Sequence, residues 1–372
     1  MPERMRTVLS AMGQPLAALL LAFLLGAVLI AVVTRNPAAP FSAYGALFAG
    51  AFGDPLAWSN TLRQATPLLF TGTAVAVALA AGLFNIGAEG QMAVGALAAA
   101  TVGFVLKESV PPVLLLPLSL LAGAGAGALW ALPPVLLKVY RGAHEVITAI
   151  LLNYIAQNVT RFLASGPLKD PSGEAPLTPE VGATLPRLLP QYDVTTGLFL
   201  GIAAVLWVAA VLRFAVWGLR VRAVGTSPDA AEALGISVAR KQIEAFALSG
   251  AMAGWAGAVV ILGEAPFRRF AADFYGIGYG FDGLAVALLA AGASGVVSAR
   301  TLGFLFPAAL LFGALAAGAE AMDFNANIPK QIVQVVQAVL IALVAGRLLI
   351  RLRFKPQNKP LTDPQNAPGK EP

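Results

Sequence analysis

Long apolar runs separated by short polar segments dominate this sequence. A helix that crosses about 30 Å of hydrocarbon needs roughly 20 mostly apolar residues. Ten stretches meet or approach that length, at about 15–33, 66–83, 88–106, 112–132, 145–164, 195–212, 243–262, 282–298, 301–320 and 330–350. The pattern predicts an all-α integral membrane protein with about ten transmembrane helices.

Two places in this pattern favour an interrupted helix. The runs at 66–83 and 88–106 are separated by only a few residues, and the run at 282–298 is short and contains Gly292 and Gly295. Backbone at membrane depth can leave the helical form where it lines a cavity or packs on protein. We therefore expect re-entrant or broken helices near 84–92 and 282–298.

The distribution of lysine and arginine predicts the orientation. With ten spans and a cytosolic N-terminus, 16 of the 25 basic residues fall on the cytosolic side, as the positive-inside rule requires. Residues 165–194, rich in proline, glycine and acids, are then an external loop, and the basic segment 213–242 is cytosolic. We expect a transmembrane domain over 1–353 and a disordered cytosolic tail over 354–372, with both termini in the cytosol.

Composition supports membrane burial and excludes several chemistries. Charged residues are 12% of the chain, and apolar residues are 58% before its 38 glycines are added, whereas soluble domains have about 25% charged residues and about 45–50% apolar residues with glycine included. No cysteine and one histidine exclude thiolate chemistry and His-cluster metal sites. The net charge is +6, but the basic residues lie between apolar runs rather than in a stripe on one soluble face. Nucleic-acid binding is therefore not predicted. No G-x-x-x-x-G-K-S/T motif is present, which excludes a P-loop.

The segment Gly82–Met92 places an acid and two amides between two apolar runs. Ionisable groups at such positions are costly, and they are functional candidates by default. Asn85, Glu89 and Gln91 are the candidates here. The alternative is a tight cytosolic turn in which Glu89 caps the helix that begins there.

The basic segment contains the signals of a short cytosolic helix. Ser227 and Pro228 fit the N-cap and the first helical position, and Gly235 fits the end of the helix. A helix of about two turns is not stable alone. It is therefore either a connector resting on the membrane domain or a docking element for a cytosolic partner.

Further polar and small residues recur at helical spacing within the apolar runs. Asn153, Gln157 and Arg161 form one stripe, which serves either as helix–helix glue or as part of a solute path. Among Gln331, Gln334 and Gln337, at least one must face the bundle. The glycine pair at 123 and 127 and the three glycines at 250, 254 and 257 are typical of close helix packing.

Four of these runs carry a family resemblance. They are GLFNIGAEGQMAVGALAAA (82–100), HEVITAILLNYIA (144–156), GLRVRAVGTSPDAAEALGISVAR (218–240) and NIPKQIVQVVQAVLIALV (327–344). They resemble permease subunits of ABC importers in the branched-chain amino acid and simple-sugar group. The likeness is greatest to the longer permease of nucleoside uptake systems fed by lipoproteins of the basic membrane protein type. It covers about Gly45 to Leu349.

The resemblance implies specific roles. In that family the cytosolic loop forms the coupling helix that sits on the ATPase, which here falls on Arg222, Gly225, Pro228, Ala231, Glu232 and Gly235. The family's substrate-pathway segment falls on Asn85, Gly87, Glu89 and Gln91. Phe84, Asn153 and Gln157 add a ring face and amides suited to a neutral nucleoside, and Glu89 is assigned a structural hydrogen bond at a helix start.

The resemblance also implies partners and a location. These are an ATP-binding-cassette ATPase, a second and paralogous permease, a substrate-binding lipoprotein and the lipid of a bacterial inner membrane. No cofactor is bound by this chain, because ATP and Mg²⁺ belong to the ATPase. The alternative is a self-sufficient secondary carrier that couples uptake of a small polar solute to protons through Glu89, Glu145 or Asp282. A docking helix distinguishes the two, since a secondary carrier has no need of one.

Overall fold

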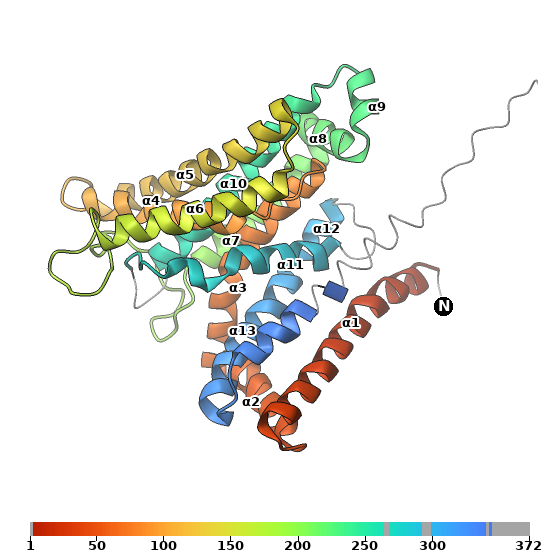
Figure 1. Ribbon diagram of the computed structural model, residues 1–372, viewed down its shortest axis with the longest axis vertical. Coiled ribbons are helices and arrows are strands. Elements are labelled where there is room, and N and C mark those ends of the chain that lie inside the picture. Colours follow the sequence, from red (N-terminus) through yellow and green to blue (C-terminus); the bar gives the residue numbers. More distant parts are fainter. Residues whose placement is uncertain (1–2, 264–267, 292–298, 340–341, 344–372) are drawn as a thin grey trace, which may run out of the picture.

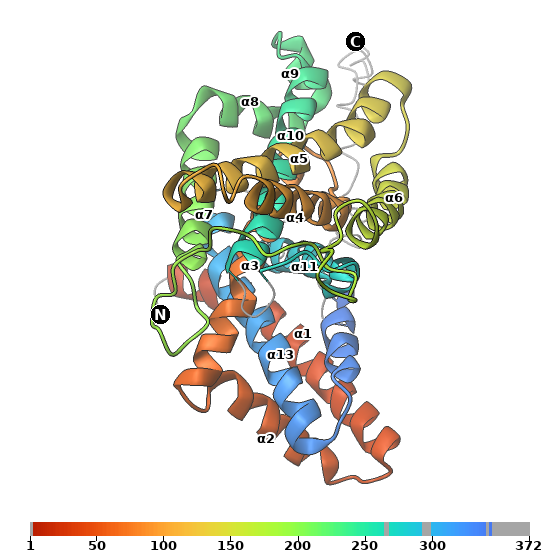
Figure 2. The same cartoon turned by 90° about the vertical axis from the view of Figure 1, so that its left-hand side faces the viewer.

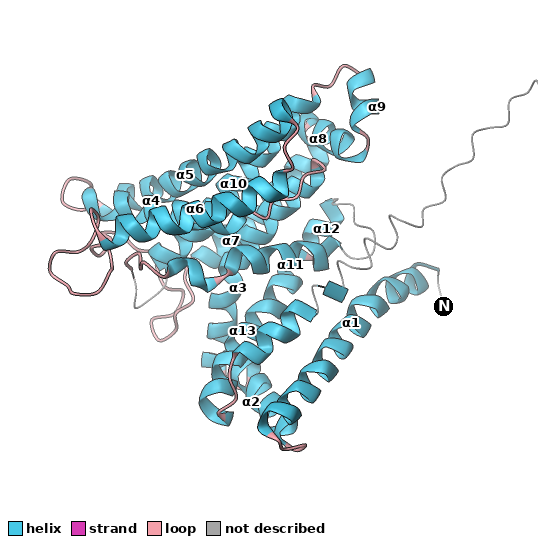
Figure 3. Cartoon of the chain, in the orientation of Figure 1, coloured by secondary structure: helices cyan, strands magenta, loops and turns pink. Residues whose placement is uncertain are grey.

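The computed structural model describes residues 3–263, 268–291, 299–339 and 342–343, and it shows helices joined by loops (Figures 1 and 3). In chain order the elements are α1 (Glu3–Thr34), α2 (Ala39–Phe52), α3 (Pro55–Ala80), α4 (Ala88–Val105), α5 (Pro112–Arg141), α6 (Glu145–Ser165), α7 (Gly197–Phe214), α8 (Val216–Thr226), α9 (Pro228–Ala233), α10 (Val238–Gly263), the 3₁₀ turn η1 (Phe274–Ile277), α11 (Tyr279–Ala291), α12 (Ala299–Gly303) and α13 (Leu305–Ala326). Residues 331–339 are also helical. The expected tail at 354–372 lies outside the described residues.

Among the residues that the structure describes, six segments are long and apolar enough to span a membrane: Ala88–Val105, Pro112–Arg141, Glu145–Ser165, Gly197–Phe214, Val238–Gly263 and Thr301–Ala326. Two shorter apolar segments, Ala18–Thr34 and Tyr279–Ala291, accompany them. The prediction of an all-α protein with membrane-spanning helices is confirmed over the described part of the chain. The total of ten spans and the side on which each terminus lies stay predictions.

The chain leaves the helical form close to where the sequence predicts a break. α3 ends at Ala80 and α4 begins at Ala88, and the turn between them contains Gly82 at φ 74°, a left-handed conformation that favours glycine. For the second expected break, α11 is continuous from Tyr279 to Ala291, and residues 292–298 lie outside the described residues.

α3 lies in the middle of the bundle, packed against α7, α10, α11 and α13. It is mostly buried although it carries several threonines. The hydroxyls of Thr66, Thr71 and Thr73 each donate to the carbonyl one turn earlier, over 2.8, 3.3 and 2.6 Å. Because these bonds stay within the helix, the threonines can be buried without leaving polar groups unsatisfied.

Glycines bring α4, α5 and α10 into backbone contact. A Cβ added to Gly95 of α4 would lie 2.4 Å from the Cα of Gly254, and one added to Gly127 of α5 would lie 2.3 Å from the carbonyl oxygen of Gly250. The small-residue stripes of the sequence are therefore the contact surfaces of three helices, as expected for membrane helices that pack without a hydrophobic driving force.

The two ends of the bundle differ. α8 and α9 project together from one end, at the top of Figure 2, and α2 lies at the opposite end. The long loop 166–196 is on the side away from α9 (Figure 1). It pairs with the segment after α10, since Thr178 N donates to Phe270 O (3.0 Å) and Phe270 N donates to Thr178 Oγ1 (2.9 Å).

Candidate functional site

Buried amides hold the segment between α3 and α4. Asn85 Nδ2 donates to Gln91 Oε1 (2.8 Å) and Gln91 Nε2 donates to Asn85 Oδ1 (3.0 Å). Asn85 Nδ2 also donates to Ser249 Oγ of α10 (2.8 Å), and that hydroxyl donates to the carbonyl of Ala74 in α3 (2.6 Å). Because burying polar groups is costly unless they are hydrogen-bonded, this set ties α3, α4 and α10 in one arrangement.

Asn153 connects α6 to the same segment. Its Oδ1 accepts from Gly90 N (3.0 Å) and its Nδ2 donates to Ile86 O (3.0 Å). The backbones are so close that a Cβ on Gly90 would lie 2.7 Å from Asn153 Oδ1. Of the predicted polar stripe on α6, only Asn153 is buried, whereas Gln157 is half-buried and Arg161 is exposed.

Glu89 stands in the first turn of α4 but bonds to a different helix. Its Oε2 accepts from Gly280 N (2.6 Å) and from Phe281 N (3.3 Å) at the start of α11. The first N–H groups of a helix have no partner within it and carry partial positive charge. The expected hydrogen bond at a helix start is therefore present, but at α11 rather than at the helix to which Glu89 belongs.

The structure brings together most of the residues expected to form a substrate pathway. Asn85, Glu89, Gln91 and Asn153 are at most 2% exposed and their polar groups are engaged, while Gly87 is buried beside them and Phe84 and Gln157 are half-buried. In this conformation the arrangement joins five helices. The bundle also contains a cavity, and these residues are not among those that line it.

That cavity, of about 740 Å³, lies at the end of the bundle away from α9. Its volume is within the range of small-molecule sites, about 300–1,000 Å³. The polar residues that line it are Asn60, Arg63, Gln64, Asp193, Arg269, Asp273, Tyr279, Asp282, Glu320, Lys330, Gln334 and Gln337. Among the residues that the structure describes, no three acidic or histidine side chains gather as a metal site would require.

A chain of hydrogen bonds crosses the cavity wall. Tyr279 Oη of α11 donates to Gln64 Oε1 of α3, and Gln64 Nε2 donates to Glu320 Oε1 of α13 (3.0 Å). Arg63 Nη2 lies 3.9 Å from Glu320 Oε2. These contacts set the relative positions of three helices at the cavity.

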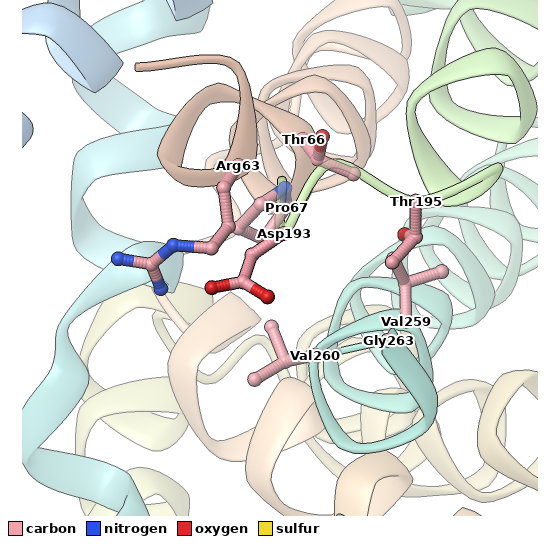
Figure 4. A pocket seen from close by; sticks show the side chains of 8 residues that line it. All are labelled: Arg63, Thr66, Pro67, Asp193, Thr195, Val259, Val260 and Gly263. Carbon is pink, nitrogen blue, oxygen red and sulfur yellow. The ribbon is translucent and has the colours of Figure 1, made fainter. Parts of the chain in front are cut away.

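A smaller pocket adjoins the cavity and shares Arg63, Asp193 and Val260 with it. It is bounded by α3, the end of α10 and the loop before α7 (Figure 4). Its space of about 20 Å³ suffices for a water molecule rather than a solute. Asp193 is held there by Arg187, whose Nη2 lies 3.0 Å from Asp193 Oδ1.

Sequence reasoning found part of the cavity lining. It named Asp282, although as a proton-coupling group, and it expected at least one of the late glutamines to face the bundle, as the buried Gln337 does. Gln331 and Gln334 are exposed, although Gln334 also lines the cavity. It missed Gln64 and Tyr279. The stripe of Asn60, Arg63 and Gln64 on one face of α3 is a signal that could have revealed Gln64.

The predicted cytosolic helix is α9. Ser227 is its N-cap, with Ala230 N donating to Ser227 Oγ (3.4 Å), and Gly235 ends it at φ 74°. Ala231 is buried, whereas Glu232 is exposed and Leu234 is 78% exposed. An apolar side chain so exposed at the end of a short polar helix is available to a partner.

The helix before α9 lies directly on the turn between α3 and α4. A Cβ on Gly225 of α8 would lie 2.2 Å from the carbonyl oxygen of Ala80, and one on Gly82 would lie 3.2 Å from the Cα of Gly225. Arg222, also on α8, has a buried Nε without a partner among the described residues. Movement of α8 and α9 would therefore act first on the segment that leads to Asn85.

The chain matches known transport proteins over most of its length. The family model described as "Branched-chain amino acid transport system / permease component" matches residues 57–356. The guanosine ABC transporter permease protein NupP of Bacillus subtilis is 37% identical over 342 residues, which are 91% of this chain and 94% of that protein. No solved structure gives a significant match.

Two other relatives differ in the solute that their names state. The glucose ABC transporter permease protein TsgB13 of Haloferax volcanii is 33% identical over 95% of this chain and 92% of its own length. The nucleoside ABC transporter permease protein NupB of Lactococcus lactis is 33% identical over 91% of this chain and 92% of its own length. A second L. lactis permease, NupC, is 29% identical over 54% of this chain and 65% of its own length.

Proposed function

Because the chain belongs to the family of permease components of branched-chain amino acid transport systems, we propose that it is the membrane-spanning permease of an ABC importer that takes up nucleosides. Subunits of this family have no ATPase domain and bind no cofactor, and the chain is a multi-pass membrane protein. The names of its relatives state guanosine, glucose or nucleosides as the solute, so the solute class is nucleosides or simple sugars. Nucleosides are the narrower assignment that we favour.

We place the permease in a bacterial inner membrane with ten spans over 1–353 and both termini in the cytosol. The loop 165–194 is then external, the segment 213–242 cytosolic, and 354–372 a cytosolic tail. The bias of lysine and arginine supports this orientation. So does the separation of α8 and α9 from loop 166–196 at opposite ends of the bundle (Figure 1).

Three protein partners complete the importer. α9 docks on a separate ATPase subunit, which binds ATP and Mg²⁺, and a lipoprotein delivers the solute from outside. The second permease is a paralogue, since L. lactis has both NupB and NupC and the chain is similar to both. The coupling surface comprises Arg222, Gly225, Pro228, Ala231, Glu232 and Gly235, with the exposed Leu234 beside it.

The segment 84–91, with Asn153 and Gln157, belongs to the substrate pathway as the part that transmits motion. The turn just before it contacts α8 through Gly82 and Gly225, and Glu89 of the segment accepts a hydrogen bond from the start of α11. α11 in turn lines the cavity with Tyr279 and Asp282. Docking and closure of the ATPase at α9 would thus move the helices that line the cavity, with this segment transmitting the motion.

A proton-coupled carrier is supported less well. Glu145 is paired with Lys138, whose Nζ lies 2.6 Å from Glu145 Oε2, and Glu89 is engaged by two backbone N–H groups of α11. Neither acid has a free place in a proton relay in this conformation. The observation that favours the importer most is α9, a short helix with an exposed leucine that a carrier would not need.

Charge reversal on α9 tests the importer. Glu232→Lys should leave the level of permease in the membrane unchanged but remove the ATPase during co-purification and abolish uptake of radiolabelled guanosine. Glu108→Lys, the same change in the exposed turn between α4 and α5, is the matched control and should retain the ATPase. Wild-type ATPase retention and uptake in Glu232→Lys would show that α9 is only a connector. Competition with excess glucose and leucine then tests the nucleoside assignment.

A further inference from the structure

Within the described residues, two of the four carboxylates that line the cavity, Asp273 and Asp282, have no hydrogen-bond or ion-pair partner, and of these two Asp273 is exposed. Asp282 lies one turn into α11, half-buried, and lines the cavity. In the described part of the chain, no hydrogen bond or ion pair reaches its side chain. Asp193 is paired with Arg187 at 3.0 Å, and Glu320 accepts from Gln64 at 3.0 Å. Asp282 is therefore a strong acceptor that the protein itself leaves unused.

An unused amide lies in the same cavity. Gln337 lines it from the helix at 331–339 and is 7% exposed. Among the described residues its amide, too, has no hydrogen-bond partner. Buried amides and carboxylates are normally hydrogen-bonded. Two such groups, from helices far apart in the chain and facing one cavity, indicate a polar ligand that satisfies both.

The charge of the lining restricts that ligand. Four carboxylates and three basic side chains line the cavity. Two of the basic residues, Arg63 and Arg269, already lie beside Glu320 and Asp170, and the third, Lys330, is exposed. The described lining has no excess of positive charge that would bind a phosphate group, so it suits a neutral solute.

We propose that this cavity is the solute-binding site of the permease, and that Asp282 binds a pair of neighbouring hydroxyl groups of a neutral sugar-bearing solute while Gln337 contacts the same solute. The two oxygens of a carboxylate can accept one hydrogen bond from each hydroxyl of a vicinal diol, and bonds to a charged acceptor are the stronger kind. An amide both donates and accepts, so it suits a hydroxyl or the edge of a base.

The identity of the solute rests on the proposed function, whereas the diol site does not. Ribose in a nucleoside and a free hexose both carry vicinal hydroxyls, and both solute classes occur among the relatives. Guanosine, 2′,3′-dideoxyguanosine and glucose are therefore the probes. The first two differ only in the diol, and the third tests the hexose source.

The experiment measures equilibrium binding of these probes to the permease–ATPase complex in lipid nanodiscs, without the lipoprotein. The wild type should bind guanosine about tenfold or more tightly than dideoxyguanosine, because two hydrogen bonds to a carboxylate are lost. Asp282→Leu should remove this preference and Asp282→Asn should reduce it. Gln337→Leu should weaken the binding of both nucleosides. Asp323→Asn, at an exposed acid near the end of α13 that does not line the cavity, is the matched control and should bind as the wild type does.

The outcomes separate the site from the function. Retention of the diol preference in Asp282→Leu, or no preference in the wild type, overturns the site even if the complete importer still takes up guanosine. Binding of glucose but not guanosine, with the same dependence on Asp282, supports the site and overturns the nucleoside assignment. Retention of the ATPase by each variant shows that loss of binding is not loss of folding, and the nearly isosteric Asp282→Asn repeats the test with least disturbance.

Discussion

The carboxylate of Glu89 in α4 accepts a hydrogen bond from the backbone N–H of Gly280 in α11, over 2.6 Å. The two residues are 191 positions apart in the chain, and the backbones meet so closely that a Cβ on Gly280 would lie 2.4 Å from Glu89 Cα. An acid of one helix thus caps another helix that begins within the bundle. Because the same turn of α11 carries Tyr279 and Asp282, this contact positions two residues of the cavity wall.

Substitution of Glu89 should separate capping from proton coupling. Glu89→Gln keeps an acceptor oxygen for Gly280 N and should retain folding and most uptake, with little change on addition of an uncoupler at constant ATP. Glu89→Leu leaves the N–H group of Gly280 without its acceptor, whereas Phe281 N keeps its bond to Gly278 O (3.1 Å). The loss at Gly280 should cost about 1–3 kcal/mol. The melting temperature in detergent and the uptake rate measure both effects. Loss of uptake in Glu89→Gln together with uncoupler sensitivity in the wild type would favour the proton-coupled carrier.

Sequence periodicity predicted the helices well because membrane burial imposes long apolar runs. It could not predict that α3 is the central helix, since its threonines lower its hydropathy while their hydroxyls are satisfied inside the helix. It singled out Asn85, Glu89, Gln91 and Asn153 from their cost in an apolar setting, and the structure joins them. It could not say which helix Glu89 caps.

The cavity could not be predicted from the sequence for a similar reason. Its lining comes from segments more than 200 residues apart, as the bond from Tyr279 to Gln64 illustrates. Each segment alone shows only two or three polar residues at helical spacing. Their convergence on one space follows from how α3, α11 and α13 cross, and periodicity carries no information about that crossing.

Two glycines of α5 offer a direct test of the helix packing. Gly127→Ala would place a methyl group 2.3 Å from Gly250 O, so α5 and α10 must separate, at a cost of about 1–3 kcal/mol. Gly125→Ala, half a turn away, meets nothing within 4 Å, and should be neutral or stabilise the helix by up to about 1 kcal/mol. Melting temperatures of the two variants in the same detergent decide the matter. Equal destabilisation by both would contradict the packing described here.

The loop 166–196 should detach at low pH. Hydrogen bonds from the hydroxyl and the backbone N–H of Ser172, together with Arg269, lower the pKa of Asp170 to about 2. A carboxyl whose pKa is about 4 in the unfolded chain then stabilises the loop above that pH, and the contribution is lost as the pH falls through about 2. Hydrogen exchange at Thr178 N and Phe270 N, corrected for the intrinsic rate, should rise between about pH 4 and pH 2.

Asp170→Asn is the control for this pH dependence. It removes the titrating group and the ion pair with Arg269, so exchange at the two amides should be faster at neutral pH and nearly independent of pH across the same range. A wild-type loop whose protection is unchanged down to pH 2 would show that the backbone pairing alone holds it.

The orientation in the membrane can be tested with single cysteines, because the chain contains none. Ser172 lies in the long loop and Ala233 at the end of α9, and both are exposed. If the acidic, proline-rich loop is external and the basic segment cytosolic, as the positive-inside rule requires, Ser172→Cys should react with an impermeant maleimide on intact cells. Ala233→Cys should react only after the membrane is opened. Since α8, α9 and the loop lie at opposite ends of the bundle (Figure 1), labelling of both cysteines on intact cells would contradict the span count, and labelling of Ala233→Cys alone would invert the topology.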